Sequence, residues 1–185
     1  GALAMRHLQS LGHRRIAVIR GPDEMFDSEP RWAGIQHAAA EGGIRLDPRL
    51  VYQLPNRVDP RSGFDGGLQC TRDMLASGCE FTAVLAFDDL TALGVVRGLD
   101  EAGRRVPEDC SVVGFDDILP AALATPGMTT VRQPLREMGL LATQRMLKAL
   151  EQPKASGKPR LQMLAPELVV RGSSAPARAD ERGSL

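Results

Sequence analysis

Two pairs of adjacent aspartates are the residues of this sequence whose placement most plainly predicts a chemical role. Asp88–Asp89 and Asp116–Asp117 each come directly after a short apolar run, at residues 83–87 and 111–115. An uninterrupted apolar run bounded by turn residues is typical of a strand buried on both faces, as in a parallel sheet. Ligands of open parallel sheets bind beyond the carboxyl ends of the strands. We therefore expect both pairs to lie at one ligand site.

The chemistry of these side chains favours a hydroxyl-bearing small molecule, because a carboxylate accepts two or more hydrogen bonds. A structural role is the alternative, and Asp89 could be the N-cap of a helix that begins at Leu90. We expect one aspartate of each pair to cap or turn the chain and the other, Asp88 or Asp116, to face the ligand. Clustered carboxylates could also hold Mg²⁺, but the sequence lacks a phosphate-cradling glycine loop, which makes that less favoured.

Arg31 is the cation that we expect at the same edge of the sheet. It follows a polar loop, residues 23–30, and stands at the start of a helix that comes after the first strand. A guanidinium there can bridge carboxylates and donate to ligand oxygens in a fixed fork. The alternative is a solvated surface arginine, and only the predicted position of Arg31 beside the aspartates argues against it.

Candidates for catalysis are few. His7, His13 and His37 fall on helices or turns, away from the carboxyl ends of the predicted strands, and Cys70 falls in mid-helix, as a small core residue does. Neither a nucleophile elbow nor a dinucleotide or phosphate-loop fingerprint occurs. The sequence gives no positive reason to expect an enzyme, and we predict no metal and no cofactor.

Alternating strand and helix patterns must position these residues. This alternation predicts an α/β fold: a Rossmann-like parallel sheet with right-handed crossovers and helices on both faces. A polar tail, residues 173–185, is expected to be disordered. The expected strands are residues 16–19, 50–52, 83–87, 111–115, 129–133 and 167–170, and the expected helices are residues 3–11, 31–41, 63–76, 90–103 and 135–150.

Composition and charge exclude several classes of function. The chain has 185 residues, and its 23 basic residues equal its 23 acidic ones, so no net field attracts nucleic acid or an anionic membrane. Three unpaired cysteines are typical of reduced thiols in the cytoplasm. No apolar run is long enough to span a bilayer, and no signal peptide is evident. Because the sequence opens close to a helix with no preceding strand, we expect it to be part of a longer chain.

Six segments, in order along nearly the whole chain, carry a resemblance to a known family. Together they resemble the regulatory core of lactose/galactose-repressor-type (LacI/GalR) transcription factors, although each segment alone is a weak signal. The segments are Leu11–Ile19, Arg31–Gly34, Phe87–Gly94, Gly103–Asp117, Thr129–Pro134 and Glu167–Arg171.

This resemblance implies a periplasmic-binding-protein-like fold, in which two Rossmann-like subdomains hold a small effector between them. Residues 1–125 would form the second subdomain, residues 126–152 would cross into an incomplete first subdomain, and residues 153–172 would return. Operator DNA would be read by a helix-turn-helix that this sequence does not contain. The protein would be a cytoplasmic homodimer that does not bind membranes. We expect the dimer surface to include the helix at residues 90–102, whose Val95, Val96 and Leu99 exceed what one core face needs. The alternative is that the same chain covers both faces of this helix.

The resemblance also implies site residues. Arg31 and Asp116 fall on the family's ligand-contacting arginine and acid, and Asp88 falls on a polar position that is often asparagine. Val58 replaces an aromatic residue that stacks on the ligand in some members, and Phe87 or Trp32 could partly compensate. The expected effector is a sugar, polyol or nucleoside. Two rivals are a periplasmic sugar-binding protein of a transporter and a metal-dependent α/β enzyme.

Overall fold

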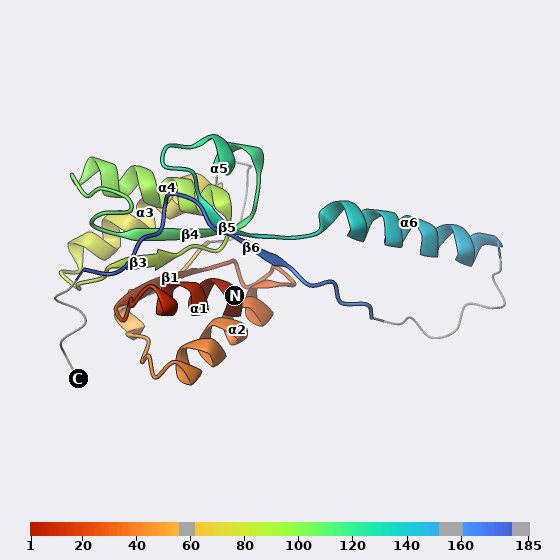
Figure 1. Ribbon diagram of the computed structural model, residues 1–185, viewed down its shortest axis with the longest axis horizontal. Coiled ribbons are helices and arrows are strands. Elements are labelled where there is room, and N and C mark those ends of the chain that lie inside the picture. Colours follow the sequence, from red (N-terminus) through yellow and green to blue (C-terminus); the bar gives the residue numbers. More distant parts are fainter. Residues whose placement is uncertain (56–61, 152–160, 179–185) are drawn as a thin grey trace.

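A six-stranded sheet forms the centre of the protein in the computed structural model, which describes residues 1–55, 62–151 and 161–178 (Figure 1). The strand order is β2-β1-β3-β4-β5-β6, and every neighbouring pair is parallel except β5 and β6, which are antiparallel. The α/β prediction is confirmed, with one correction: the last strand runs against the rest. The strands are β1 Ile16–Arg20, β2 Val51–Gln53, β3 Ala83–Leu85, β4 Ser111–Asp116, β5 Thr129–Arg132 and β6 Glu167–Val169.

Helices cover both faces of the sheet, as expected. In Figure 1, α1 and α2 lie on one side of the strands and α3, α4 and α5 lie on the other. Within β1, Ile16 and Val18 pack with α1 and α2, whereas Ala17 and Ile19 pack with the core beneath α3 and α4. Successive strand residues point to opposite faces, so a strand covered on both faces must be apolar throughout. The helices are α1 Ala2–Ser10, α2 Ser28–Glu41, α3 Ser62–Ala76, α4 Asp89–Glu101, α5 Leu119–Leu123 and α6 Leu135–Glu151, with a 3₁₀ turn, η1, at Pro48–Leu50.

Helix α4 is packed within the chain more completely than the sequence indicated. Val95 and Leu99 have no exposed surface, and Val96 packs half-buried against the same core. The helix also packs so closely against α3 that a side chain at Gly94 would collide with the backbone carbonyl of Phe64. The argument that these apolar residues exceed one core face is therefore wrong, since α3 and the sheet together cover them.

The segment after β6 is ordered as far as residue 178. Ser173 is fully buried, and its hydroxyl donates to the Val112 carbonyl at 2.6 Å. Ala177 is also buried, and its amide donates to the Leu11 carbonyl at 2.8 Å. The prediction of disorder from residue 173 is therefore wrong for residues 173–178, because these hydrogen bonds fix them against β4 and the end of α1. Residues 179–185 lie outside the described part of the chain.

Helix α6 extends away from the sheet and has no buried residue (Figure 1). Its apolar side chains stay exposed, with Leu140 at 55% and Leu150 at 70% of their full surface. Exposed apolar surface of this extent marks a face that packs against something else. Among the described helices, none is long and apolar enough to cross a membrane.

Candidate functional site

Arg31 occupies the centre of the candidate site, at the carboxyl ends of β1, β3 and β4. It lies in the first turn of α2, and only 13% of its side chain is exposed. One guanidinium nitrogen, Nη1, donates to the Phe87 carbonyl at 2.7 Å, and the other, Nη2, pairs with Asp27. The expectation of Arg31 at this sheet edge is confirmed, and the alternative of a solvated surface arginine is wrong.

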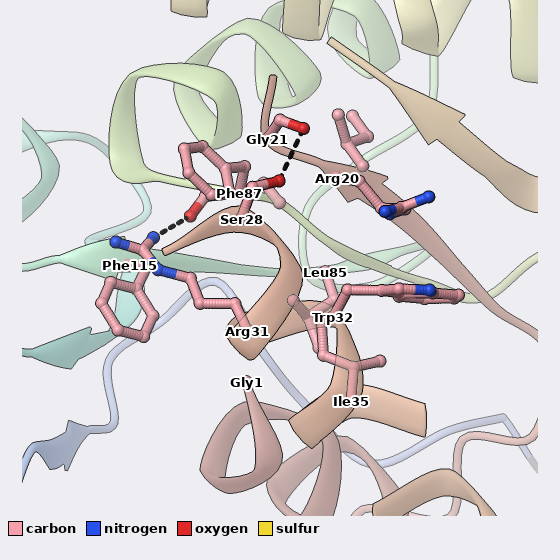
Figure 2. Close-up of a pocket in the computed structure, with 12 residues that line it drawn as sticks. Gly1, Arg20, Gly21, Ser28, Arg31, Trp32, Ile35, Leu85, Phe87 and Phe115 are labelled. Atoms are coloured by element: carbon pink, nitrogen blue, oxygen red, sulfur yellow. Dashed lines mark hydrogen bonds between the residues drawn. The ribbon is translucent and has the colours of Figure 1, made fainter. Parts of the chain in front are cut away.

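Two phenylalanines sandwich the Arg31 guanidinium (Figure 2). The guanidinium carbon lies 3.7 Å from the centroid of the Phe115 ring and 4.5 Å from that of the Phe87 ring. Such stacking is attractive and restricts the rotation of a planar guanidinium. Phe115 was missed in the sequence, although its position at the end of an apolar run, directly before Asp116, was a usable signal.

Asp116 faces Arg31 from the end of β4. Its Oδ1 atom accepts a hydrogen bond from Gln133 Nε2 at 2.6 Å and lies 3.8 Å from Arg31 Nη2. Burial raises the pKa of the Asp116 carboxyl, while Gln133 and the Arg31 charge act in the opposite direction. The structure therefore brings Asp116 and Arg31 together, as the sequence predicted. The second aspartate of the pair, Asp117, turns the chain with a φ of +60°.

In the first aspartate pair it is Asp88, and not Asp89, that caps the following helix, so the alternative that named Asp89 as the N-cap is wrong. Asp88 is the N-cap of α4, accepting a hydrogen bond from the Thr91 amide at 2.8 Å. Asp89 is fully buried inside the first turn and accepts hydrogen bonds from the Thr130 hydroxyl at 2.6 Å and the Ile118 amide at 2.8 Å. Burial raises the pKa of Asp89 to about 6. Asp89 is therefore a core carboxyl. Asp88 caps the helix and its charge acts on Asp116, and its contact with a ligand stays a prediction.

The space enclosed at the site is small. About 20 Å³ remains between Arg31, Phe87, Phe115 and their neighbours, which is room for roughly one water molecule. This space is too small for a sugar-sized molecule, and we call the outer side of Arg31 and Phe115 the floor of the site. Trp32 lies apart from this floor, with the Arg20 guanidinium 5.0 Å from its ring centroid (Figure 2).

Val58 and Phe87 were also expected to contact a ligand. Val58 lies outside the described residues, so its contact with a ligand stays a prediction. Phe87 is at the site, but only 5% of it is exposed, and its ring is directed at Arg31. Among the residues that the structure describes, no group of three or more histidine, cysteine, aspartate or glutamate side chains could hold a metal ion.

Known proteins share both the sequence and the shape of this chain. The periplasmic binding protein-like domain family matches residues 5–174. The regulator DegA of Bacillus subtilis is 34% identical over 95% of this chain and 50% of its own length. The ribose operon repressor of Escherichia coli K12 is 34% identical over 94% of this chain and 50% of its own length.

Solved structures agree. The transcriptional regulator CelR in complex with cellobiose superposes with a TM-score of 0.83 at 34% identity, covering 92% of this chain and 50% of that one. A LacI family regulator of Enterococcus faecium with bound ribose gives a TM-score of 0.81 at 31% identity, covering 96% and 62%. The chain spans about half the length of the curated relatives that it matches. It belongs to the periplasmic binding protein-like domain family, in the form found in LacI-type transcriptional regulators.

Proposed function

We propose that this chain is the effector-binding part of a bacterial DNA-binding transcriptional regulator, a repressor that senses a small polar molecule. The effector, a sugar, polyol or nucleoside, would rest on the floor formed by Arg31 and Phe115 and would bond to Asp116 and Asp88. One observation carries this proposal: a fixed guanidinium and a partly buried carboxylate face each other, 3.8 Å apart, at the carboxyl ends of the strands.

The chemistry of this pair suits hydroxyl groups. A sugar hydroxyl both donates and accepts, so it can donate to Asp116 and accept from Arg31. The Phe115 ring adds an apolar surface of the kind on which sugar rings and bases pack. Two relatives match this chemistry, since one is a ribose operon repressor and another was solved with cellobiose.

The remaining half of the relatives' length would supply the other wall of the site. We assign residues 1–125 and the returning residues 153–172 to one subdomain, together with β5, because β5 pairs with β4 and β6 in the same sheet. Of residues 126–152, expected to cross over as a whole, we assign α6 to the other subdomain. The exposed apolar face of α6 supports this division, because a helix of that kind packs against a partner. The helix-turn-helix that reads operator DNA would also belong to that remaining half.

The regulatory step would be a change in the relative orientation of the two subdomains in a cytoplasmic homodimer. An effector bound between them shifts this equilibrium by the difference in its affinity for the two orientations. A periplasmic sugar-binding protein of a transporter is not favoured, because the relatives compared with the chain are transcriptional regulators and repressors.

A thermal-shift screen against ribose, cellobiose, other sugars, polyols and nucleosides tests the proposal, on the chain and on the longer regulator from which we propose it derives. A ligand at about 100 times its Kd adds about 2.7 kcal/mol to stability, which raises Tm by roughly 5–10 °C in a domain of this size. Asp116→Asn should lose that shift, and Asp100→Asn, at an exposed α4 position, should keep it. If no compound raises Tm in either protein, or if Asp116→Asn keeps the full shift, the proposal fails.

A further inference from the structure

Two arginines, Arg132 and Arg171, bond to Asp117, the residue after the proposed ligand-binding Asp116; we call these contacts the clasp. The Asp117 side chain is 9% exposed and accepts hydrogen bonds of 2.6 Å from Arg132 Nε and from Arg171 Nη2. Burial alone would raise the pKa of this carboxyl, but the two arginines outweigh it and hold the pKa below its ordinary value. The clasp therefore keeps a charged group fixed at the end of β4.

The backbone at this point is in an unusual conformation. Asp116 has a φ of +109° and Asp117 a φ of +60°, and both values lie in a region that residues other than glycine rarely adopt. Two such residues in succession persist only when the surrounding contacts hold them. In the described structure those contacts include the arginines on Asp117, the Gln133 amide on Asp116 and the Asp89 carboxylate, which accepts from the Ile118 amide at 2.8 Å.

The arginines and Gln133 lie at the ends of β5 and β6, the two strands next to α6 in the chain. Arg132 ends β5, opposite Asp116 in the strand register, and Gln133 follows it directly. Arg171 comes just after β6 and also donates to the Met128 carbonyl at 2.8 Å, at the start of β5. Arg132 in addition reaches Glu167 of β6 at 3.5 Å. The turn after β4 is thus tied to both the outgoing and the returning segment.

We propose that Asp117, through Arg132 and Arg171, is a positioning residue that holds the Asp116 carboxylate towards Arg31 and ties it to β5 and β6. Movement of either strand would then displace the carboxylate that faces the ligand, and a ligand held by Asp116 would resist that movement. Only the ligand role of Asp116 rests on the proposed function; the mechanical link does not need a ligand.

The test measures the titration of the Asp116 carboxyl carbon by NMR in the intact chain. If the clasp positions Asp116, Asp117→Asn releases the carboxylate to solvent, and its raised pKa falls towards the ordinary value of an aspartate. The double variant Asp117→Asn/Arg132→Gln removes one charge of each sign, so the same fall in that variant reports position and not a change of charge. Asp100→Asn, an exposed acid on α4, is the matched control and should leave the titration unchanged.

Amide hydrogen exchange provides a second readout. In Asp117→Asn, exchange at residues 115–118 and at residues 130–133 should rise together, by roughly tenfold or more, if the two segments open as one unit. Should Asp117→Asn not fold, Arg132→Gln carries the test, because losing a nearby cation would raise the pKa of Asp116 whereas loosening the turn would lower it. An Asp116 titration that is unchanged, or that returns to the wild-type curve in the double variant, overturns the proposal. A failed ligand screen would leave these results intact.

Discussion

Replacing Asp89 with asparagine should stabilise the protein at neutral pH, which is the reverse of what deleting a hydrogen-bonded buried carboxylate usually does. Asp89 has no exposed surface and receives hydrogen bonds from the Thr130 hydroxyl and the Ile118 amide. In the described residues no cation lies within ion-pair distance of it. A buried carboxylate without a cation is destabilised in its charged form, since neutral donors replace only part of its hydration.

The magnitude can be worked out from proton linkage. Burial raises the pKa of Asp89 from 3.8 to about 6 in the folded chain. At about 1.36 kcal/mol per pKa unit, this difference corresponds to about 3 kcal/mol. Between pH 4 and pH 6 the folded state keeps a proton that the unfolded state has released, so stability falls as the pH rises through this window. Above about pH 6 both states are ionised and the full penalty is present.

Asparagine fits the same contacts without a charge. Its amide oxygen can accept from the Ile118 amide, and its NH₂ group can donate to the Thr130 hydroxyl, which is able to accept as well as to donate. The free energy of unfolding should be measured from urea titrations at pH 4.0, 5.0, 6.0 and 7.5. We expect Asp89→Asn to match the wild type near pH 4 and to exceed it by up to about 3 kcal/mol at pH 7.5.

Two results would refute this reasoning. A variant that is less stable than the wild type at pH 7.5 would mean that the charged form is held by contacts stronger than those described. A difference that does not change between pH 4 and pH 7.5 would mean that Asp89 does not titrate in this window. Asp100→Asn, whose carboxylate is exposed, is the control and should follow the wild-type pH dependence closely.

Two further predictions concern the ligand site and the sheet. Arg31→Lys should weaken binding of any sugar found in the screen by on the order of 1 to 3 kcal/mol, because an ammonium cannot donate to the Phe87 carbonyl and Asp27 together as the planar guanidinium does. Isothermal titration calorimetry measures this affinity, and an unchanged value would remove Arg31 from the site. Val113→Asp should abolish folding, because Val113 is fully buried in β4; a cooperative melt at the wild-type Tm would contradict the buried-strand assignment.

Much of the sheet could be predicted because it is buried on both faces. Strands such as β1 and β4 are continuous apolar runs, and their ends mark the carboxyl edge of the sheet, which is why the sequence could place Arg31 and Asp116 together there. Phe115 was not found: its position directly before Asp116 could have placed it at this edge, but an aromatic residue in an apolar run is also typical of a core residue. Its contact with Arg31 depends on how far α2 is set from β4, which sequence periodicity does not encode.

The errors at the carboxyl-terminal end have a related cause. Strand β6 runs antiparallel to β5, and the pattern of three residues carries no information on direction. Residues 173–178 looked like a polar tail, but Ser173 and Ala177 are held by backbone groups of Val112 and Leu11. Pairing over such separations along the chain is set by the tertiary fold, so local composition misjudged it.

The two aspartate pairs have the same sequence and take different roles because the chain continues differently after each strand. After β3 a helix begins at once, so Asp88 caps it and Asp89 turns back into the core. After β4 the chain makes a turn with positive φ, so Asp117 meets two arginines and Asp116 faces Arg31. Two of the four carboxylates are thereby committed to core or clasp contacts. Asp116 lies 3.8 Å from Arg31, too long for a direct hydrogen bond, and a ligand hydroxyl bonded to both groups would complete the contact that this distance leaves unmade.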